Sequence, residues 1–191
     1  TALARTVEGF LELAAARRAA AIEAFGRAIR LESNAPLPRL GLGLAKIRGG
    51  ALAAGRAEIE TAVALDPRRA DLRTWLGRAY FEENRPEKAR AQYAIALEED
   101  PDAPTPRLFS ALERFAANDP VGALGWIESA EGLGDARATL RGPAGLGEDR
   151  AVRGAALARV YDTLGFAPLA RRTGAAAAER DPGNPEAHFF L

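Results

Sequence analysis

Few residues of this sequence could carry out catalysis or bind a metal. His188 is the only histidine among 191 residues and cysteine is absent, so the usual nitrogen and sulfur ligands of zinc and iron sites cannot be assembled. Neighbouring carboxylates, such as Glu82 with Glu83 or the acidic run 98–100, could act as general acid and base. We interpret them as solvated surface, because they lie near predicted helix ends and turns in a highly charged chain. The sequence therefore predicts no catalytic residue, no metal site and no cofactor, and a protein that is not an enzyme.

Phosphate and nucleic-acid binding also have little support in the sequence. Gly132, Gly134, Gly145 and Gly147 are spaced like parts of a phosphate-binding loop, yet neither pair completes the pattern GxGxxG, and no strand is predicted before them. The 26 basic residues are balanced by 26 acidic ones, so the formal net charge is zero. Binding to nucleic acid requires a clustered surplus of positive charge, and we therefore expect no nucleic-acid partner.

The strongest pattern in the chain is a triad of small, large and small residues that recurs every 34 residues. The triads are Ala21, Phe25, Ala28; Gly55, Ile59, Ala62; Ala89, Tyr93, Ala96; and Ala123, Ile127, Ala130. A further small residue lies twelve positions before each triad, at Gly9, Gly43, Gly77 and Ala111. Two antiparallel helices approach closely only where side chains are small, and a larger apolar residue fills the space beside the crossing. The period therefore predicts stacked helical hairpins that bury one continuous core.

The best-conforming unit identifies a family resemblance. Its residues Leu76, Gly77, Tyr80, Ala89, Tyr93, Ala96 and Pro101, at their spacing, resemble the tetratricopeptide repeat family. The resemblance implies an all-α fold, a right-handed superhelical solenoid of stacked helix-turn-helix hairpins. It divides the chain into repeats at 2–35, 36–69, 70–103, 104–135 and 151–184, with the start of a truncated sixth repeat at 185–191. Because the chain stops partway through this sixth repeat, we expect it to be a fragment of a longer protein.

The 34-residue rhythm is interrupted between the fourth and fifth repeats. Residues 136–150 contain Gly142, Pro143, Gly145 and Gly147, and glycine and proline at this density predict a loop. Two interpretations are open: a surface insertion without consequence, or an insertion that turns or caps the binding groove, because insertions in solenoids often lie on the binding face.

The family resemblance also implies a binding surface, since the first helices of such repeats line a concave groove. The corresponding positions are Leu40, Leu44 and Ile47 in the second repeat, Thr74, Arg78 and Phe81 in the third, and Leu108, Leu112 and Phe115 in the fourth. This largely apolar set would suit an amphipathic helix or an extended apolar segment of a partner protein. Alternatively, if the helices are rotated about their axes, the stripe is core. Arg39, Arg73 and Arg107 would then form a surface ladder that pairs with carboxylates of adjacent helices or binds an acidic partner.

Taken together, the repeats predict a non-catalytic protein–protein interaction scaffold in a bacterial multiprotein assembly of the envelope or of secretion. The alternative is a structural or regulatory repeat segment of a larger enzyme or outer-membrane channel, with no partner in trans. Residues 146–191 also resemble the repeat blocks of large bacterial envelope proteins that join such repeats to an outer-membrane barrel. This favours a periplasmic or outer-membrane-associated location over the cytoplasm. No apolar run in the chain approaches membrane-spanning length, so we expect no direct membrane insertion of this segment.

Overall fold

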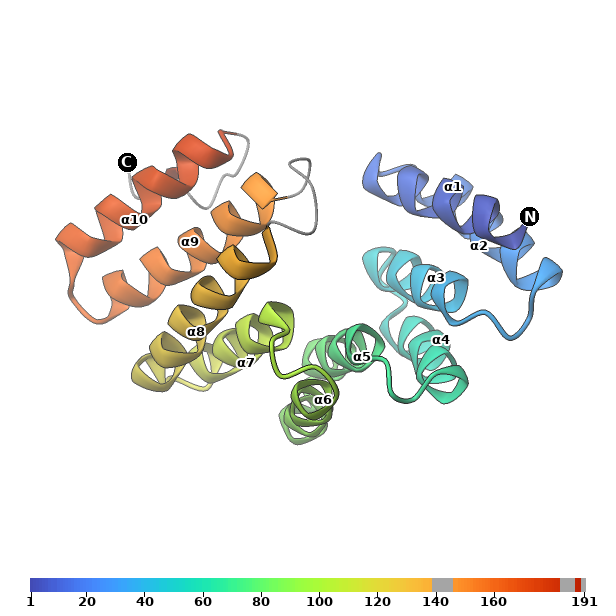
Figure 1. The fold of residues 1–191 in the computed structure, drawn as a ribbon, viewed down its shortest axis with the longest axis horizontal. Coiled ribbons are helices and arrows are strands. Elements are labelled where there is room, and N and C mark those ends of the chain that lie inside the picture. Colours follow the sequence, from blue (N-terminus) through green and yellow to red (C-terminus); the bar gives the residue numbers. More distant parts are fainter. Residues whose placement is uncertain (139–145, 183–187, 190–191) are drawn as a thin grey trace. The chain divides into compact units, whose positions relative to one another are not determined.

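The computed structural model describes residues 1–138, 146–182 and 188–189, and every regular element in these ranges is an α-helix (Figure 1). The chain divides into two compact units, Thr1–Asp100 (unit 1) and Pro101–Leu191 (unit 2). Unit 1 contains α1 Ala2–Ala14, α2 Arg18–Leu31, α3 Pro36–Arg48, α4 Leu52–Leu65, α5 Ala70–Glu82 and α6 Pro86–Glu99. Unit 2 contains α7 Pro104–Ala116, α8 Pro120–Ala138, α9 Leu146–Thr163 and α10 Ala167–Arg180.

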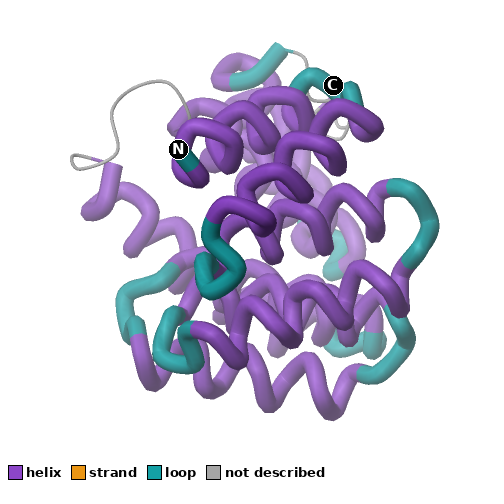
Figure 2. The backbone as a smooth tube through the Cα atoms, turned by 90° about the vertical axis from the view of Figure 1, so that its right-hand side faces the viewer, coloured by secondary structure: helices purple, strands orange, loops and turns teal. Residues whose placement is uncertain are grey.

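Successive helices pair as hairpins in both units. In unit 1 the hairpins are α1 with α2, α3 with α4 and α5 with α6, and the second helix of each hairpin packs on the first helix of the next. In unit 2, α7 pairs with α8 and α9 with α10, and α8 packs on α9. Short loops connect the helices (teal in Figure 2). The prediction of an all-α fold built from stacked helix-turn-helix hairpins is confirmed for the part of the chain that the structure describes.

The turn inside each hairpin uses a left-handed backbone conformation at one position. That position is Ala16, Gly50, Asn84, Asn118 and Gly165, with φ between 57° and 82°. The first four lie 34 residues apart, so the turn repeats with the helices. Glycine and asparagine adopt this conformation at little cost, whereas alanine at position 16 is an exception. The turn reverses the chain within a few residues and sets the two helices side by side.

In unit 1, each triad places its large residue against the small residue of the facing helix. A Cβ atom added to Gly9 would lie 2.5 Å from the Phe25 ring, and one added to Gly43 would lie 2.6 Å from Ile59. The same overlap would arise between Gly77 and the Tyr93 ring. These large residues are almost fully buried, as is the alanine that closes each triad. The physical account of the repeat, in which a small residue permits a close crossing beside a large one, is therefore confirmed in unit 1.

Helix also occupies both ends of the predicted insertion at 136–150. α8 continues to Ala138 and α9 begins at Leu146, while residues 139–145, with Gly142, Pro143 and Gly145, lie outside the described residues. Gly132 and Gly134 belong to α8 and Gly147 belongs to α9, so these three glycines are helical. Most of the predicted sixth repeat, 185–191, also falls outside the described residues.

Candidate functional site

A cavity of about 510 Å³ lies in unit 1 among the first helices of its three hairpins. Its lining residues are Phe10, Leu13 and Ala14 of α1, Leu40, Leu44, Ile47 and Arg48 of α3, and Trp75, Arg78, Ala79 and Glu82 of α5. On α3 the apolar residues are spaced by four and three positions, so they share one helical face. The volume falls within the range of about 300–1,000 Å³ that is typical of ligand pockets. We call this cavity the α1–α3–α5 pocket.

The pocket has a fixed apolar base and accessible apolar side chains. Leu13 and Leu40 are buried and belong to the base. Phe10 meets the ring of Phe25 edge to face, with 5.0 Å between the ring centroids, and this contact holds it in place. Leu44 and Trp75 are only partly buried, so a bound molecule could contact them. The pocket therefore offers an apolar surface without moving any core residue.

Charged groups gather where α3 and α5 end. Arg78 forms an ion pair with Glu82, and its guanidinium lies 5.4 Å from the centroid of the Phe81 ring. Arg48 donates a hydrogen bond of 3.0 Å from Nη1 to the main-chain oxygen of Leu13, near the end of α1. The apolar pocket thus has a polar rim, which can orient an amphipathic segment.

The groove residues that the sequence predicts in unit 1 differ in how deeply they are buried. Leu40, Leu44, Ile47 and Arg78 line the pocket. Thr74 is buried, and its hydroxyl donates a 2.7 Å hydrogen bond to the oxygen of Ala70 in its own helix. Phe81 is partly buried beside Arg78 and does not line the pocket.

In unit 2, the predicted groove residues belong to α7. Leu108 is buried in a core cluster with Ile127 and Val160, and Leu112 and Phe115 pack against this cluster. Leu108 therefore contributes to the core of unit 2. A role of Leu112 and Phe115 in partner binding stays a prediction.

The periodic arginines make intramolecular hydrogen bonds. Arg39 Nη1 lies 3.0 Å from Glu58 Oε2 of α4, and Arg73 Nη1 lies 3.1 Å from Gln92 Oε1 of α6. Both pairs span 19 residues and join the two helices of one hairpin. Arg107 donates to the oxygen of Ala103, at 3.0 Å. Arg39 and Arg73 thus each connect the two helices of a hairpin, but only Arg39 does so through a carboxylate, and Arg107 bonds to the residue that precedes its own helix.

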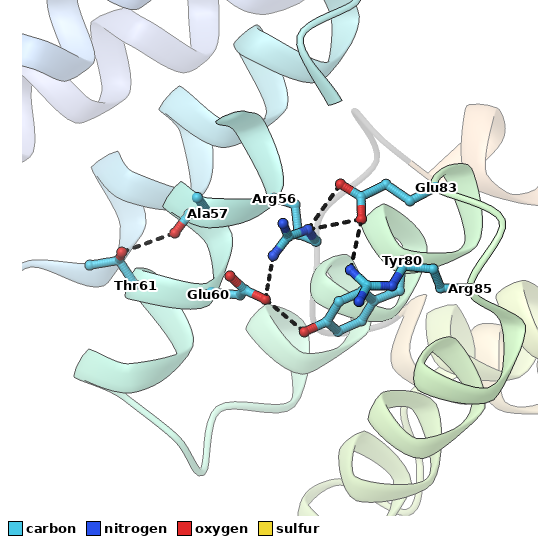
Figure 3. Close-up of polar contacts among 7 residues, drawn as sticks. All are labelled: Arg56, Ala57, Glu60, Thr61, Tyr80, Glu83 and Arg85. Atoms are coloured by element: carbon cyan, nitrogen blue, oxygen red, sulfur yellow. Dashed lines mark hydrogen bonds and ion pairs between the residues drawn. The ribbon is translucent and has the colours of Figure 1, made fainter. Parts of the chain in front are cut away.

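A second polar cluster joins α4 to α5 and to the turn before α6 (Figure 3). Arg56 lies between two carboxylates, 2.6 Å from Glu60 Oε1 and 2.9 Å from both oxygens of Glu83. The Tyr80 hydroxyl donates to Glu60 at 2.7 Å, and Arg85 lies 3.2 Å from Glu83. Glu83, a candidate acid or base in the sequence, is thus paired with two arginines. Its partner in that sequence pair, Glu82, is paired with Arg78.

The paired carboxylates predict a loss of stability in acid. Burial raises the pKa of Glu58, Glu60 and Glu83, but hydrogen bonds from their basic and hydroxyl partners outweigh it and hold each pKa below the ordinary value of 4.5. A carboxyl whose pKa is lower in the folded chain stabilises the fold above the unfolded pKa, and this contribution is lost as the pH falls through the folded pKa.

We therefore expect the free energy of unfolding, measured with urea, to fall as the pH drops below about 4.5. The double variant Glu58→Gln with Glu83→Gln should be less stable than the parent at neutral pH and should show a shallower loss in acid. If the free energy of unfolding fell equally steeply with pH in the parent and in the variant, Glu58 and Glu83 would not be the carboxylates responsible for the loss.

No described helix is both long and apolar enough to cross a membrane. Across the same described ranges, no group of three or more histidine, aspartate or glutamate side chains is placed to hold a metal ion.

Comparisons with known proteins agree on the repeat architecture. Residues 50–115 match the family model described as tetratricopeptide repeat. No protein of curated function matches the sequence significantly. Many solved structures are similar to the chain, among them the three that follow. A thermophilic TPR protein of Thermus thermophilus is 20% identical, with a TM-score of 0.82 over 99% of this chain and 96% of that one.

The second similar structure is the hetero-tetramer Cut9–Hcn1 of the APC/C, with 14% identity and a TM-score of 0.85. It matches 98% of this chain, which spans only 35% of that one. The third is YrrB, described as a TPR protein with an unusual peptide-binding site, with 15% identity and a TM-score of 0.56 over 99% of this chain and 91% of that one. At these identities the likeness shows the fold alone. The fold is consistent with a protein–protein interaction scaffold.

Proposed function

We propose that this chain, a tetratricopeptide-repeat protein, is a non-catalytic scaffold whose α1–α3–α5 pocket binds an apolar stretch of a partner protein. The observation that carries the proposal is the pocket itself, about 510 Å³ in volume, with Leu44 and Trp75 accessible in its wall. An exposed apolar hollow is costly to keep in water, and its retention is expected where another molecule fills it.

The composition of the pocket indicates the kind of segment it would take. Most of its lining residues are apolar, and the charged ones are Arg48, near the end of α3, and the ion-paired Arg78 and Glu82 of α5. An amphipathic helix matches this pattern, because apolar side chains at positions i and i+4 enter the wall while polar residues meet the rim. A uniformly charged peptide would leave the apolar wall exposed. We therefore favour an amphipathic helical partner.

We also propose that the partner belongs to a bacterial multiprotein assembly. Support comes from composition: only Lys46 and Lys88 of the 26 basic residues are lysines, and this arginine bias together with heavy use of alanine is typical of proteins from GC-rich bacterial genomes. Membership of an envelope or secretion assembly, and a periplasmic or outer-membrane-associated location, are parts of the same proposal. Localising the tagged protein by cell fractionation tests it.

The fluorescence of Trp75 provides a direct test of binding in the pocket. The chain has two tryptophans, and Trp126 is a partly buried residue of unit 2 that packs against its core cluster. The variant Trp126→Phe therefore leaves Trp75, in the pocket wall, as the only tryptophan. We would select amphipathic helical peptides by display against the chain and titrate them into this variant. We expect a saturable shift of the Trp75 emission to shorter wavelength.

The matched control is Trp75→Phe, in which only Trp126 emits, and its emission should not change on addition of peptide. Peptides that bind with the same affinity but leave the Trp75 emission unchanged would contradict binding in the pocket.

A further inference from the structure

The lining of the α1–α3–α5 pocket repeats with the chain. The last residues of the three helices all line it: Ala14, Arg48 and Glu82. The residues four positions earlier line it as well: Phe10, Leu44 and Arg78. Each first helix therefore contributes two residues at equivalent positions, and a spacing of four places both on one helical face.

The charges of these pairs are balanced in α5 but not in α3. Arg78 forms an ion pair with Glu82 within α5. In α3 the equivalent residues are Leu44 and Arg48, so the charge of Arg48 has no partner one turn earlier in its own helix. Two arginines against one glutamate leave the pocket lining with one positive charge in excess.

Arg48 is held in place without being neutralised. Its Nη1 donates a hydrogen bond of 3.0 Å to the main-chain oxygen of Leu13. A guanidinium carries five N–H donors, so this bond leaves further donors for another acceptor. Among the described residues, Arg48 forms no ion pair with a carboxylate, and its side chain is exposed. A side chain that is already ordered loses less conformational freedom when it binds a carboxylate.

A second arginine adds positive charge beside Arg48. Arg18, the first residue of α2, lies against Gly49, and its Nη1 would be 3.0 Å from a Cβ atom at that glycine. In the part of the chain that the structure describes, Arg18 also forms no ion pair. The carboxylate of Glu12, near the end of α1, is bonded to Arg17. The junction of the first two hairpins is therefore positively charged where it adjoins the pocket.

These charges define the kind of partner that the pocket suits. We propose that the partner segment carries an aspartate or glutamate one helical turn from its apolar anchor, and that this side-chain carboxylate pairs with Arg48. The inference rests on the proposed function, in which the anchor contacts Leu44 and Trp75. Covering the pocket takes water away from Arg48, and a guanidinium that loses water is stabilised only if it gains an acceptor.

The spacing follows from the geometry of α3. Leu44 and Arg48 are separated by four residues, or about 6 Å along the helix axis. A partner helix that lies along α3 spans this distance with residues three or four positions apart. Such a helix inserts side chains and keeps its backbone outside the wall. The carboxylate should therefore come from a side chain and not from a chain end.

Peptides of altered charge test the proposal on the full chain. A peptide that shifts the Trp75 emission of the Trp126→Phe chain is acetylated and amidated at its ends, and its apolar anchor is found by alanine scanning. Glutamate, glutamine or lysine is then placed in turn three and four residues before and after the anchor. At one or more of these positions, glutamate should bind about three- to fivefold more tightly than glutamine, and lysine more weakly than both.

The preference should follow the charge at position 48. Arg48→Gln keeps an N–H donor but removes the charge, so it should bind glutamate and glutamine peptides equally. Arg48→Glu should prefer the lysine peptide. The control Arg30→Glu changes the net charge as much, at an exposed position of α2 outside the pocket, and should keep the preference of the parent. Circular dichroism and melting of the Arg48 variants should stay close to the parent, because the side chain is exposed.

Equal affinity of glutamate and glutamine peptides at every tested position would overturn the proposal, as would an unchanged preference in Arg48→Gln. If a glutamine peptide gained affinity when its C-terminal carboxylate was left free, a chain end would be bound and the assignment to a side chain would be wrong. Binding that shifts the Trp75 emission without any carboxylate preference would overturn this inference alone. Failure of every peptide to shift that emission would overturn the proposed function and this inference with it.

Discussion

Replacing Phe25 with alanine should lower the free energy of unfolding of unit 1 by about 3–5 kcal/mol. Phe25 is fully buried in α2, and its ring fills the space that Gly9 of α1 and Gly41 of α3 leave open. It also contacts the ring of Phe10. Neither glycine has a side chain that could fill the cavity. The loss of unfolding free energy should therefore lie at the upper end of the range for large-to-small substitutions. Urea unfolding followed by circular dichroism measures it.

Two further variants test whether the loss comes from the buried contact of Phe25. Ile22→Ala lies on the same helix but at a position that is 36% exposed, and it should cost about 1 kcal/mol or less. Gly41→Ala should destabilise the parent, in which the added methyl group would overlap the Phe25 ring, but should be tolerated in the Phe25→Ala background. If the two changes were additive, the proposed fit between Phe25 and Gly41 would be wrong.

Replacing Trp75 with alanine and Leu44 with serine should abolish binding of the selected peptides. Both side chains are accessible in the pocket wall, and each should contribute at least about 2 kcal/mol, as anchor positions in interfaces do. The double variant should then bind at least about a hundredfold more weakly. Its melting temperature should fall only modestly, since neither residue is fully buried. Fluorescence anisotropy with labelled peptide and thermal melting of the same samples measure both effects.

The matched control is Leu31→Ser, at a position that is 63% exposed on α2 and outside the pocket. It removes a comparable exposed apolar side chain and should leave peptide affinity unchanged. If Leu31→Ser weakened binding as much as the pocket changes, peptide capture would reflect general surface hydrophobicity. If the pocket variant unfolded, Leu44 and Trp75 would be structural residues and the proposed site would be wrong.

The repeat architecture could be predicted because its signal is physical and periodic. A close helix crossing requires a small residue, so Gly9, Gly43 and Gly77 had to recur with the large residues they face. The turns also follow the period, since Gly50 and Asn84 supply the left-handed backbone at equivalent positions. Residue size at the crossings and the turn positions both follow the period, and both can be read from a sequence.

The burial of the predicted groove residues, unlike the repeat architecture, could not be predicted from the sequence. Leu40, Thr74 and Leu108 occupy equivalent positions in three repeats and all are buried, as is Thr6 one repeat earlier. Thr6 and Thr74 satisfy their hydroxyl groups by donating to the main-chain oxygen four residues earlier. Because threonine can be buried in this way, residue polarity did not distinguish the pocket base from its wall. The burial of this position depends on how far the first helices rotate.

The partners in hydrogen bonds and ion pairs between helices could not be predicted from the sequence either. Arg56 bonds to Glu83 across 27 residues, and Tyr80 bonds to Glu60 across 20. In a chain with 26 acidic and 26 basic residues, many pairings are conceivable. Only the packing of α4 on α5 selects these. By contrast, an intramolecular partner for Arg39 could be proposed in advance, because acidic residues are as abundant as basic ones in this chain.

The central claim, that a partner segment binds among α1, α3 and α5, is tested most directly by locating a bound peptide. A spin label on a selected amphipathic peptide broadens the amide resonances of nearby residues in the nuclear magnetic resonance spectrum of the labelled protein. We predict broadening at Leu44, Trp75 and Ala79. Broadening confined to unit 2 or to the outer side of α2, with sharp signals throughout the pocket, would contradict the claim.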